Sequence, residues 1–221
     1  MKEIKIALTG KMRVGKDTVY KLLAQELTTY AEQNNLKPEI HQIAFGDSLK
    51  EYAEALFPDR FEDGKKPREL FQWFGQTMRQ ADPDIWVKKA GQKVNQLRPF
   101  GNISYYVPPG TTDEEWEERF AHLPTEHLFA PIITDLRQPN EYKYAKENDF
   151  YIVKITAPDE IRLSRMQSTG DNFTKQSLSH ETESHIDTYK VDFTINNYRN
   201  DLDNLKEKVK FLVEDIMKQE G

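Results

Sequence analysis

The chain has 221 residues, a formal net charge of −6, 37% hydrophobic residues and no cysteine. Its length suits one α/β domain with an elaboration, and the lack of cysteine excludes disulfides, cysteine-ligated metals and thiol catalysis. The acidic net charge argues against binding of a nucleic acid polymer, and no stretch approaches the ~20 apolar residues of a membrane span. We therefore expect a cytoplasmic protein that recognises small ligands.

The first half of the chain alternates apolar and amphipathic segments. Residues 4–9 (IKIALT) are mostly apolar, as expected for a central strand of a parallel sheet, and a glycine-bounded loop follows them. Apolar residues then recur at helical spacing from Asp17, and a second strand is predicted at residues 39–45. Residues 48–97 are predicted to form three helical pieces that are separated at prolines.

The second half begins with a segment of different character and then returns to the α/β pattern. Residues 98–128 are rich in proline, glycine and acidic residues, and we interpret them as an insertion with a hairpin through 103–107 and one short acidic helix. Strands are predicted at 130–134, 150–156 and 193–196, and helices at 140–148, 158–166 and 202–218. Five strands that alternate with helices predict a parallel doubly wound sheet in a three-layer α/β/α fold.

The sharpest local signal is the loop GKMRVGKDT at residues 10–18, which has the G-x-x-x-x-G-K spacing of a Walker A motif between a predicted strand and a predicted helix. Its glycines allow backbone N–H groups to surround an anion, and the helix N-terminus adds positive potential. Lys16 supplies a charge to the β and γ phosphates. The predicted triphosphate-binding residues of the loop are Gly10, Lys11, Met12, Arg13, Val14, Gly15, Lys16, Asp17 and Thr18.

Asp17 departs from the usual motif, because the residue after the lysine is normally a serine or threonine that contacts Mg²⁺. A carboxylate beside the phosphates is tolerable where the metal, directly or through a water, offsets its repulsion from them. The equally weighted alternative is a carboxylate that compensates the helix dipole in the first turn. Thr18 still offers a hydroxyl to a phosphate.

Four further motifs follow GKDT (15–18) in chain order: FGDSLK at 45–50, LFQWFGQTMR at 70–79, DIWV at 84–87 and TDLRQPNE at 134–141. Together they resemble the deoxynucleoside monophosphate kinases of bacteriophages and bacteria, and the likeness covers most of the chain outside the insertion. Animal-type phosphomevalonate kinases have a similar Gly-Lys-Asp loop and Asp-x-Arg block, and are the nearest alternative family.

The resemblance implies a single P-loop kinase domain with Mg²⁺ and ATP as cofactor and phosphoryl donor, a deoxynucleoside monophosphate as acceptor, and often a homodimer. The implied parts are a core at 1–47 and 129–221, an acceptor-binding helical region at 48–97, the insertion at 98–128 and a lid at about 166–183.

Asp135 and Arg137 lie at the carboxyl end of a predicted strand, where ligands of open α/β sheets bind. Asp135 is predicted to orient the Mg²⁺ shell, together with Asp17, and Arg137 to hold the acceptor phosphate; the alternative is a solvated ion pair in a loop. Guanidinium groups suit a phosphate clamp and aromatic rings suit base stacking, although each of these residues alone is more often surface or core. The implied acceptor-binding residues are Lys50, Arg68, Gln72, Arg79, Trp86 and Arg137.

Arg162 and Arg165 are three residues apart on a predicted helix and so share a face, immediately before the polar segment that starts at Gln167. Kinases of this class close such lid arginines over the transferred phosphoryl group; the alternative is an exposed basic helix face. The pair Asn196-Asn197, after the last predicted strand, is predicted either to contact the adenine of ATP or to form a turn, and Asn196 is the member assigned to ATP binding. His180, Glu181, Glu183 and His185 are interpreted as a lid-end or helix-start segment rather than a metal site.

The predicted catalytic residues are therefore Lys16, Asp135, Arg137, Arg162 and Arg165. Transfer to a phosphate acceptor needs alignment and charge neutralisation but no general base, because a phosphate monoester is largely ionised near pH 7. A P-loop protein that binds nucleotide as a regulator and transfers nothing is the alternative from another functional class.

Overall fold

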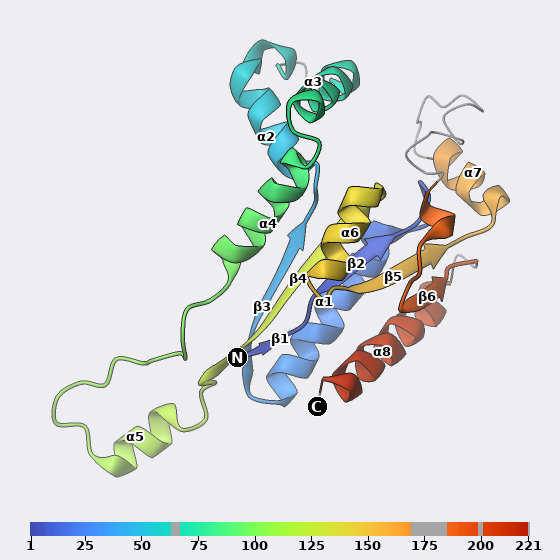
Figure 1. Ribbon diagram of the computed structural model, residues 1–221. Helices are drawn as coiled ribbons and strands as arrows, with labels where there is room; N and C mark the ends of the chain where they lie inside the picture. The colour runs from blue at the N-terminus through green and yellow to red at the C-terminus, as the bar shows by residue number, and fades with distance from the viewer. Residues whose placement is uncertain (63–66, 169–184, 199–200, 221) are drawn as a thin grey trace.

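A computed structural model describes residues 1–62, 67–168, 185–198 and 201–220 (Figure 1). Its centre is a parallel sheet in which β4 pairs on one edge with β3 and on the other with β1 and β2, followed outward by β5 and β6. The predicted fold class is confirmed. The strands are β1 (Lys2–Glu3), β2 (Ile6–Thr9), β3 (Leu36–Ile43), β4 (Glu126–Leu136), β5 (Tyr151–Thr156) and β6 (Phe193–Asn196).

The sheet has six strands where five were predicted, because the N-terminal strand is divided in two. β1 and β2 pair in parallel with the same edge of β4, with Lys2 opposite Leu128 and Ile6 opposite Ile132, and the chain leaves the strand pattern for two residues between them. Both pieces therefore occupy one position across the sheet.

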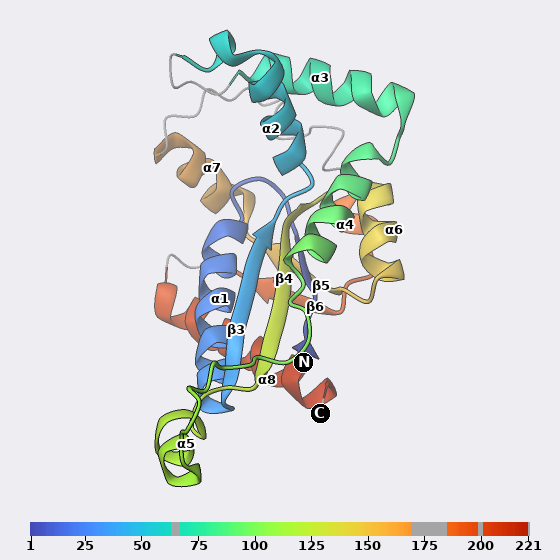
Figure 2. The same cartoon turned by 90° about the vertical axis from the view of Figure 1, so that its left-hand side faces the viewer.

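Helices cover both faces of this sheet. α1 (Lys16–Gln33) and α8 (Leu202–Gln219) pack on one face, where their leucines and valines form one core with alternate residues of β2, β4 and β5. α4 (Ile85–Leu97) and α6 (Pro139–Glu147) pack on the other face around Phe129 and Ile133. Figure 2 shows α1 on one side of the strands and α4 and α6 on the other. The three predicted layers are thus present.

The carboxyl ends of the strands face a smaller helical layer. It consists of α2 (Asp47–Leu56), a 3₁₀ turn (Pro58–Arg60), α3 (Arg68–Ala81) and the start of α4, around a separate core of Ala53, Phe74 and Trp86. The three helical pieces predicted for residues 48–97 are confirmed. α7 (Asp159–Ser168) and a 3₁₀ turn (Ile186–Thr188) complete this end of the molecule.

The insertion projects from the opposite end and carries α5 (Asp113–Phe120), the predicted acidic helix (Figure 1). Thr112 caps it with a capping box to Glu115. The predicted hairpin is wrong, since residues 103–107 form no strand. Pro99, Pro108 and Pro109 only flank this segment, and the Ile103 N–H donates to the Thr125 carbonyl at 3.0 Å instead of to a hairpin partner. None of the described helices is long and apolar enough to cross a membrane.

Candidate active site

The loop between β2 and α1 has the backbone conformation that its glycines permit. Gly10 and Gly15 have φ of +146° and +100°, and Arg13 also has a positive φ of 64°. A Cβ on Gly15 would lie 2.5 Å from Nδ2 of Asn197, and one on Gly10 would collide with the carbonyl oxygen of Ile155. Both glycines are therefore required by positive φ and by close approach of other chain segments.

Side chains from distant segments hold the outward carbonyls of this loop. Arg162 Nε donates to the Met12 carbonyl at 2.8 Å, Arg165 donates to the carbonyls of Arg13 and Val14 at 3.1 and 3.2 Å, and Asn197 Nδ2 donates to Val14 at 2.8 Å. The C=O and N–H groups of a trans peptide point in opposite directions, so peptides anchored through their carbonyls present their N–H groups to the other side. These bonds fix the carbonyl groups of the loop, and a glycine-bounded loop at a helix N-terminus is the kind of backbone that can form an anion-binding nest.

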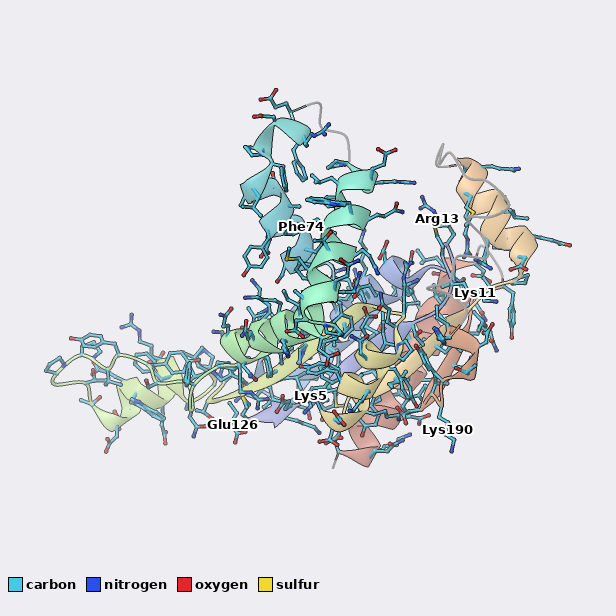
Figure 3. The ribbon with its side chains drawn as sticks, turned by 45° about the horizontal axis from the view of Figure 1, so that its top comes forward. Lys5, Lys11, Arg13, Phe74, Glu126 and Lys190 are labelled. Carbon is cyan, nitrogen blue, oxygen red and sulfur yellow. The ribbon has the colours of Figure 1, made fainter. Side chains whose placement is uncertain are left out.

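Lys16 begins α1, and its Nζ donates to the carbonyls of Gly10 and Lys11 at 2.7 and 3.1 Å. These bonds hold the ammonium group across the mouth of the loop. Asp17 and Thr18 follow it in the first turn of α1, exposed to the same space. Figure 3 labels Lys11 and Arg13 on this loop, toward the side on which α7 lies, and Phe74 in the helical layer.

A cavity of about 1030 Å³ extends from the loop to the helical layer. Of the predicted site residues, those that line it are Met12, Arg13, Gly15, Lys16, Asp17, Thr18, Lys50, Arg68, Asp135, Arg137 and Arg165. The fold therefore gathers residues from the loop, α2, α3, the end of β4 and α7 around one space.

Asp135 connects the sheet to the helical layer. Its Oδ1 accepts the Phe45 N–H at 2.8 Å and its Oδ2 accepts the Gly46 N–H at 3.2 Å, just before α2 begins. Burial raises the pKa of Asp135, and the two backbone hydrogen bonds and the nearby Arg137 partly oppose that shift. The carboxylate therefore sits at the cavity wall with a fixed orientation.

Glu141 is a site residue that the sequence reasoning did not select. Its Oε2 accepts the N–H groups of Arg137 and Gln138 at 2.8 and 2.9 Å, and the residue is 6% exposed. Burial, followed by the charge of Asp135, raises its pKa to about 7. One sequence signal points to Glu141: it stands three residues after Gln138, which is the spacing of a capping box at the start of α6.

Several predicted residues lie away from the cavity. Trp86 is 3% exposed in the helical core, and its Nε1 donates to the Gly75 carbonyl at 3.3 Å, so packing and not ligand contact explains it. Arg162 is buried behind the loop, where its guanidinium donates hydrogen bonds to the Met12 carbonyl and to the Asp159 carboxylate. Asn196 accepts the Thr156 hydroxyl at 2.6 Å, and its neighbour Asn197 lines the cavity instead. Gly10, Lys11, Val14, Gln72 and Arg79 are also absent from the cavity lining.

Further residues of the cavity lining lie at positions that the sequence analysis did not select as site residues. Gln42 and Thr134 stand on neighbouring strands, where the Gln42 amide donates to the Thr134 hydroxyl at 3.3 Å, and Asp201 and Leu205 come from the start of α8. Their convergence depends on strand register and on the chain's return after β6, which no local spacing signals. Most of the predicted lid, including His180, Glu181 and Glu183, lies outside the described residues, and His185 precedes the 3₁₀ turn at 186–188.

Asp17 and Asp135 are the predicted metal-binding pair, and both face the cavity. Within the described ranges, no group of three or more His, Cys, Asp or Glu side chains is arranged to hold a metal. This donor set fits Mg²⁺, which proteins bind through one or two carboxylates together with substrate phosphates and waters.

The parallel sheet, the glycine-bounded loop on the helix N-terminus and the lysine held across it define an α/β protein of the P-loop class. Residues 6–187 match the family model described as AAA domain, and the chain belongs to this family. No curated protein matches the sequence.

Solved structures with a similar chain course include two shikimate kinases and a sugar kinase. The shikimate kinase from Bacteroides thetaiotaomicron is 13% identical over 96% of this chain and 98% of its own, with a TM-score of 0.48. The shikimate kinase from Acinetobacter baumannii, solved in complex with shikimate, is 16% identical over 96% of this chain and 94% of its own, with a TM-score of 0.45. The sugar kinase from Janibacter sp. HTCC2649 is 13% identical over 96% of this chain and 95% of its own, with a TM-score of 0.42. Likenesses at this level carry no conclusion about activity.

Proposed function

We propose that this protein is an ATP-dependent kinase that transfers the γ-phosphate to the phosphate of a deoxynucleoside monophosphate. One observation carries the proposal: the phosphate-binding loop with Lys16 and a second set of cations, Lys50, Arg68 and Arg137, line the same cavity. A single triphosphate needs only the first set. The second set, on the helical layer and the β4–α6 turn, suits another phosphate group.

The size of the cavity agrees with two ligands. At about 1030 Å³ its volume is slightly above the roughly 300–1,000 Å³ typical of sites for one small molecule. Lys50 is held by Asp47 at 3.1 Å, which orients its ammonium group at the start of α2. Gln42 and Thr134 add neutral donors and acceptors, which suit the base or sugar of an acceptor better than its phosphate.

In the proposed reaction an acceptor phosphate oxygen attacks the γ-phosphorus in line, the bond from that phosphorus to the β–γ bridging oxygen breaks, and ADP leaves. No proton transfer is required when the acceptor phosphate is ionised. Lys16, Arg137 and Arg165 neutralise charge on the transferring group and align the two phosphates. Bound through Asp17 and Asp135, Mg²⁺ would supply charge neutralisation at the β and γ phosphate oxygens.

The test is ADP release from ATP with a panel of acceptors: the four deoxynucleoside monophosphates, the ribonucleotides, phosphomevalonate and dephospho-coenzyme A. We expect acceptor-dependent ADP with at least one deoxynucleoside monophosphate, and a loss of at least roughly 10²-fold in kcat/KM in Lys16→Ala. Lys21→Ala is the matched control, because Lys21 is exposed on the same helix.

ADP release that depends on phosphomevalonate alone would establish the alternative kinase. Tight ATP binding with no dependence on any acceptor would establish a nucleotide-binding regulator and overturn the proposal. The homodimer implied by the resemblance stays a prediction, which sedimentation of the purified protein tests.

A further inference from the structure

Arg137 lines the cavity, and both polar groups of its main chain are held by side chains. Its N–H donates to Oε2 of Glu141 at 2.8 Å, and its carbonyl accepts the hydroxyl of Tyr189 at 2.8 Å. The two partners approach from different parts of the chain, 4 and 52 residues away. Hydrogen bonds thus fix both the N–H and the carbonyl group of Arg137, which lies in the turn between β4 and α6.

Glu141 is an unusual residue to accept hydrogen bonds from the main chain of the Arg137 turn. A capping carboxylate is normally solvated, whereas Glu141 is 6% exposed and lies in the field of Asp135, which disfavours its charge. The Arg79 guanidinium on α3 and the N–H groups of Arg137 and Gln138 favour its charge. A buried acid whose bonds go to the Arg137 turn is better explained by a need to fix that turn than by helix capping alone.

Tyr189 is itself fixed. Its ring stacks on Tyr142 of α6, with centroids 4.4 Å apart and planes 10° from parallel. It directly follows the 3₁₀ turn in which Asp187 pairs with Lys11 of the phosphate loop at 3.0 Å and with Lys154 at 2.7 Å. The Arg137 carbonyl is therefore linked, through a short segment, to the loop that would hold ATP.

The first turn of α6 is also tied to the helical layer. The Asn140 amide donates to the carbonyl of Pro83 at 3.1 Å and to Oδ1 of Asp84 at 3.0 Å, in the turn between α3 and α4. The position of the Arg137 turn is thus set jointly by the helical layer and by the segment that contacts the phosphate loop.

We propose that Glu141 and Tyr189 are positioning residues that hold the main chain of Arg137 and so set its guanidinium against the acceptor phosphate. This inference rests on the proposed function. Neither residue lines the cavity, so each acts through Arg137 and not by contact with a ligand. The expected effect of losing them is therefore on acceptor binding and alignment, with ATP binding preserved.

The experiment compares Glu141→Ala, Glu141→Gln, Tyr189→Phe and wild type in the full-length protein. Glu141→Gln keeps an oxygen acceptor of the same reach, and Tyr189→Phe keeps the stacked ring and removes only the hydroxyl. Glu147→Gln is the control, because Glu147 is exposed at the end of the same helix and pairs only loosely with Lys143 at 3.7 Å. The readouts are kcat, the KM for each substrate, and hydrogen exchange of the Arg137 and Gln138 amides.

We expect Glu141→Ala to lower kcat/KM for the acceptor by roughly 10- to 100-fold, because a small misplacement of the Arg137 guanidinium costs about this much in rate. The KM for ATP should change less than about 2-fold. Tyr189→Phe should lower kcat/KM for the acceptor by roughly 2- to 10-fold. Glu141→Gln should recover most of the loss, and Glu147→Gln should match wild type. Exchange of the Arg137 amide should accelerate in Glu141→Ala alone.

Equal losses for ATP and acceptor in Glu141→Ala would overturn the inference and mark Glu141 as a general stability residue. So would unchanged acceptor kinetics in both Glu141→Ala and Tyr189→Phe. If wild type transfers phosphate to no acceptor, the proposed function fails instead. The exchange experiment, which needs no substrate, then still decides whether Glu141 holds the Arg137 turn.

Discussion

The guanidinium of Arg162 donates from Nε to the carbonyl oxygen of Met12 at 2.8 Å, joining α7 to the phosphate loop across 150 residues of chain. The same guanidinium pairs with Asp159 at 2.7 Å and is almost completely buried. Arg162 therefore supports the loop from behind, while Arg165, one turn later, reaches the cavity. The two arginines that the sequence grouped together occupy different positions around one loop.

Arg162→Leu should destabilise the protein by about 1–3 kcal/mol and weaken ATP binding, because the Met12 carbonyl loses its charged donor. Urea unfolding measures the first effect and calorimetric titration with ATP the second. Arg119→Leu, on the projecting α5, is the control and should change neither. An Arg162→Leu protein with wild-type stability and affinity would contradict this support role.

Gly15→Ala should lower the free energy of unfolding by more than the backbone strain of a positive φ alone. Alanine in that conformation costs roughly 1–2 kcal/mol, and here its Cβ also meets Nδ2 of Asn197 at 2.5 Å. Gly110→Ala is the matched control, since Gly110 has φ of +87° and nothing within 4 Å of the added carbon. Thermal unfolding of both variants separates crowding from strain, and equal losses would show that Asn197 moves away without cost.

Glu141 should make stability fall as the pH rises from 4.5 to 7. Its native pKa is raised from 4.5 to about 7, so in that window the native state keeps a proton that the unfolded chain has released. The contribution is fully present below pH 4.5, and about 3 kcal/mol of it is lost by pH 7 and above. In Glu141→Gln this part of the slope should disappear. Urea unfolding of both proteins at pH 4.5, 6 and 7.5 measures the difference, and parallel pH curves would refute the raised pKa.

Trp86→Ala should destabilise the protein by about 3–5 kcal/mol, because Trp86 is 3% exposed and packs on Phe74 in the helical core. Trp73→Ala is the control, since Trp73 is 56% exposed, and should cost less than about 1 kcal/mol. Unfolding followed by circular dichroism gives both values. A Trp86→Phe variant that keeps its fold but specifically loses acceptor affinity would instead restore Trp86 to a binding role.

Much of the architecture could be predicted from the sequence because its signals are local. Hydrophobic periodicity placed α1, α8 and the central strands, and proline positions divided residues 48–97 into the helices that include α4. The Thr112 capping position agrees with the acidic helix α5. The hairpin predicted at 103–107 is wrong for a non-local reason, since a strand needs a hydrogen-bonded partner strand and this segment has none among the described residues. The division of the first strand likewise depends on its pairing with β4.

By itself the sequence determined the phosphate loop, because residues 10–18 are contiguous and the roles of their glycines and lysine follow from backbone conformation within one turn. Only the tertiary structure decided which distant side chains meet that loop. It placed Asn197 and not Asn196 beside Gly15, moved Trp86 into a core, and set Glu141 behind Arg137. Those choices depend on strand register and helix packing, which bring together residues whose separation along the chain gives no sign of their contact.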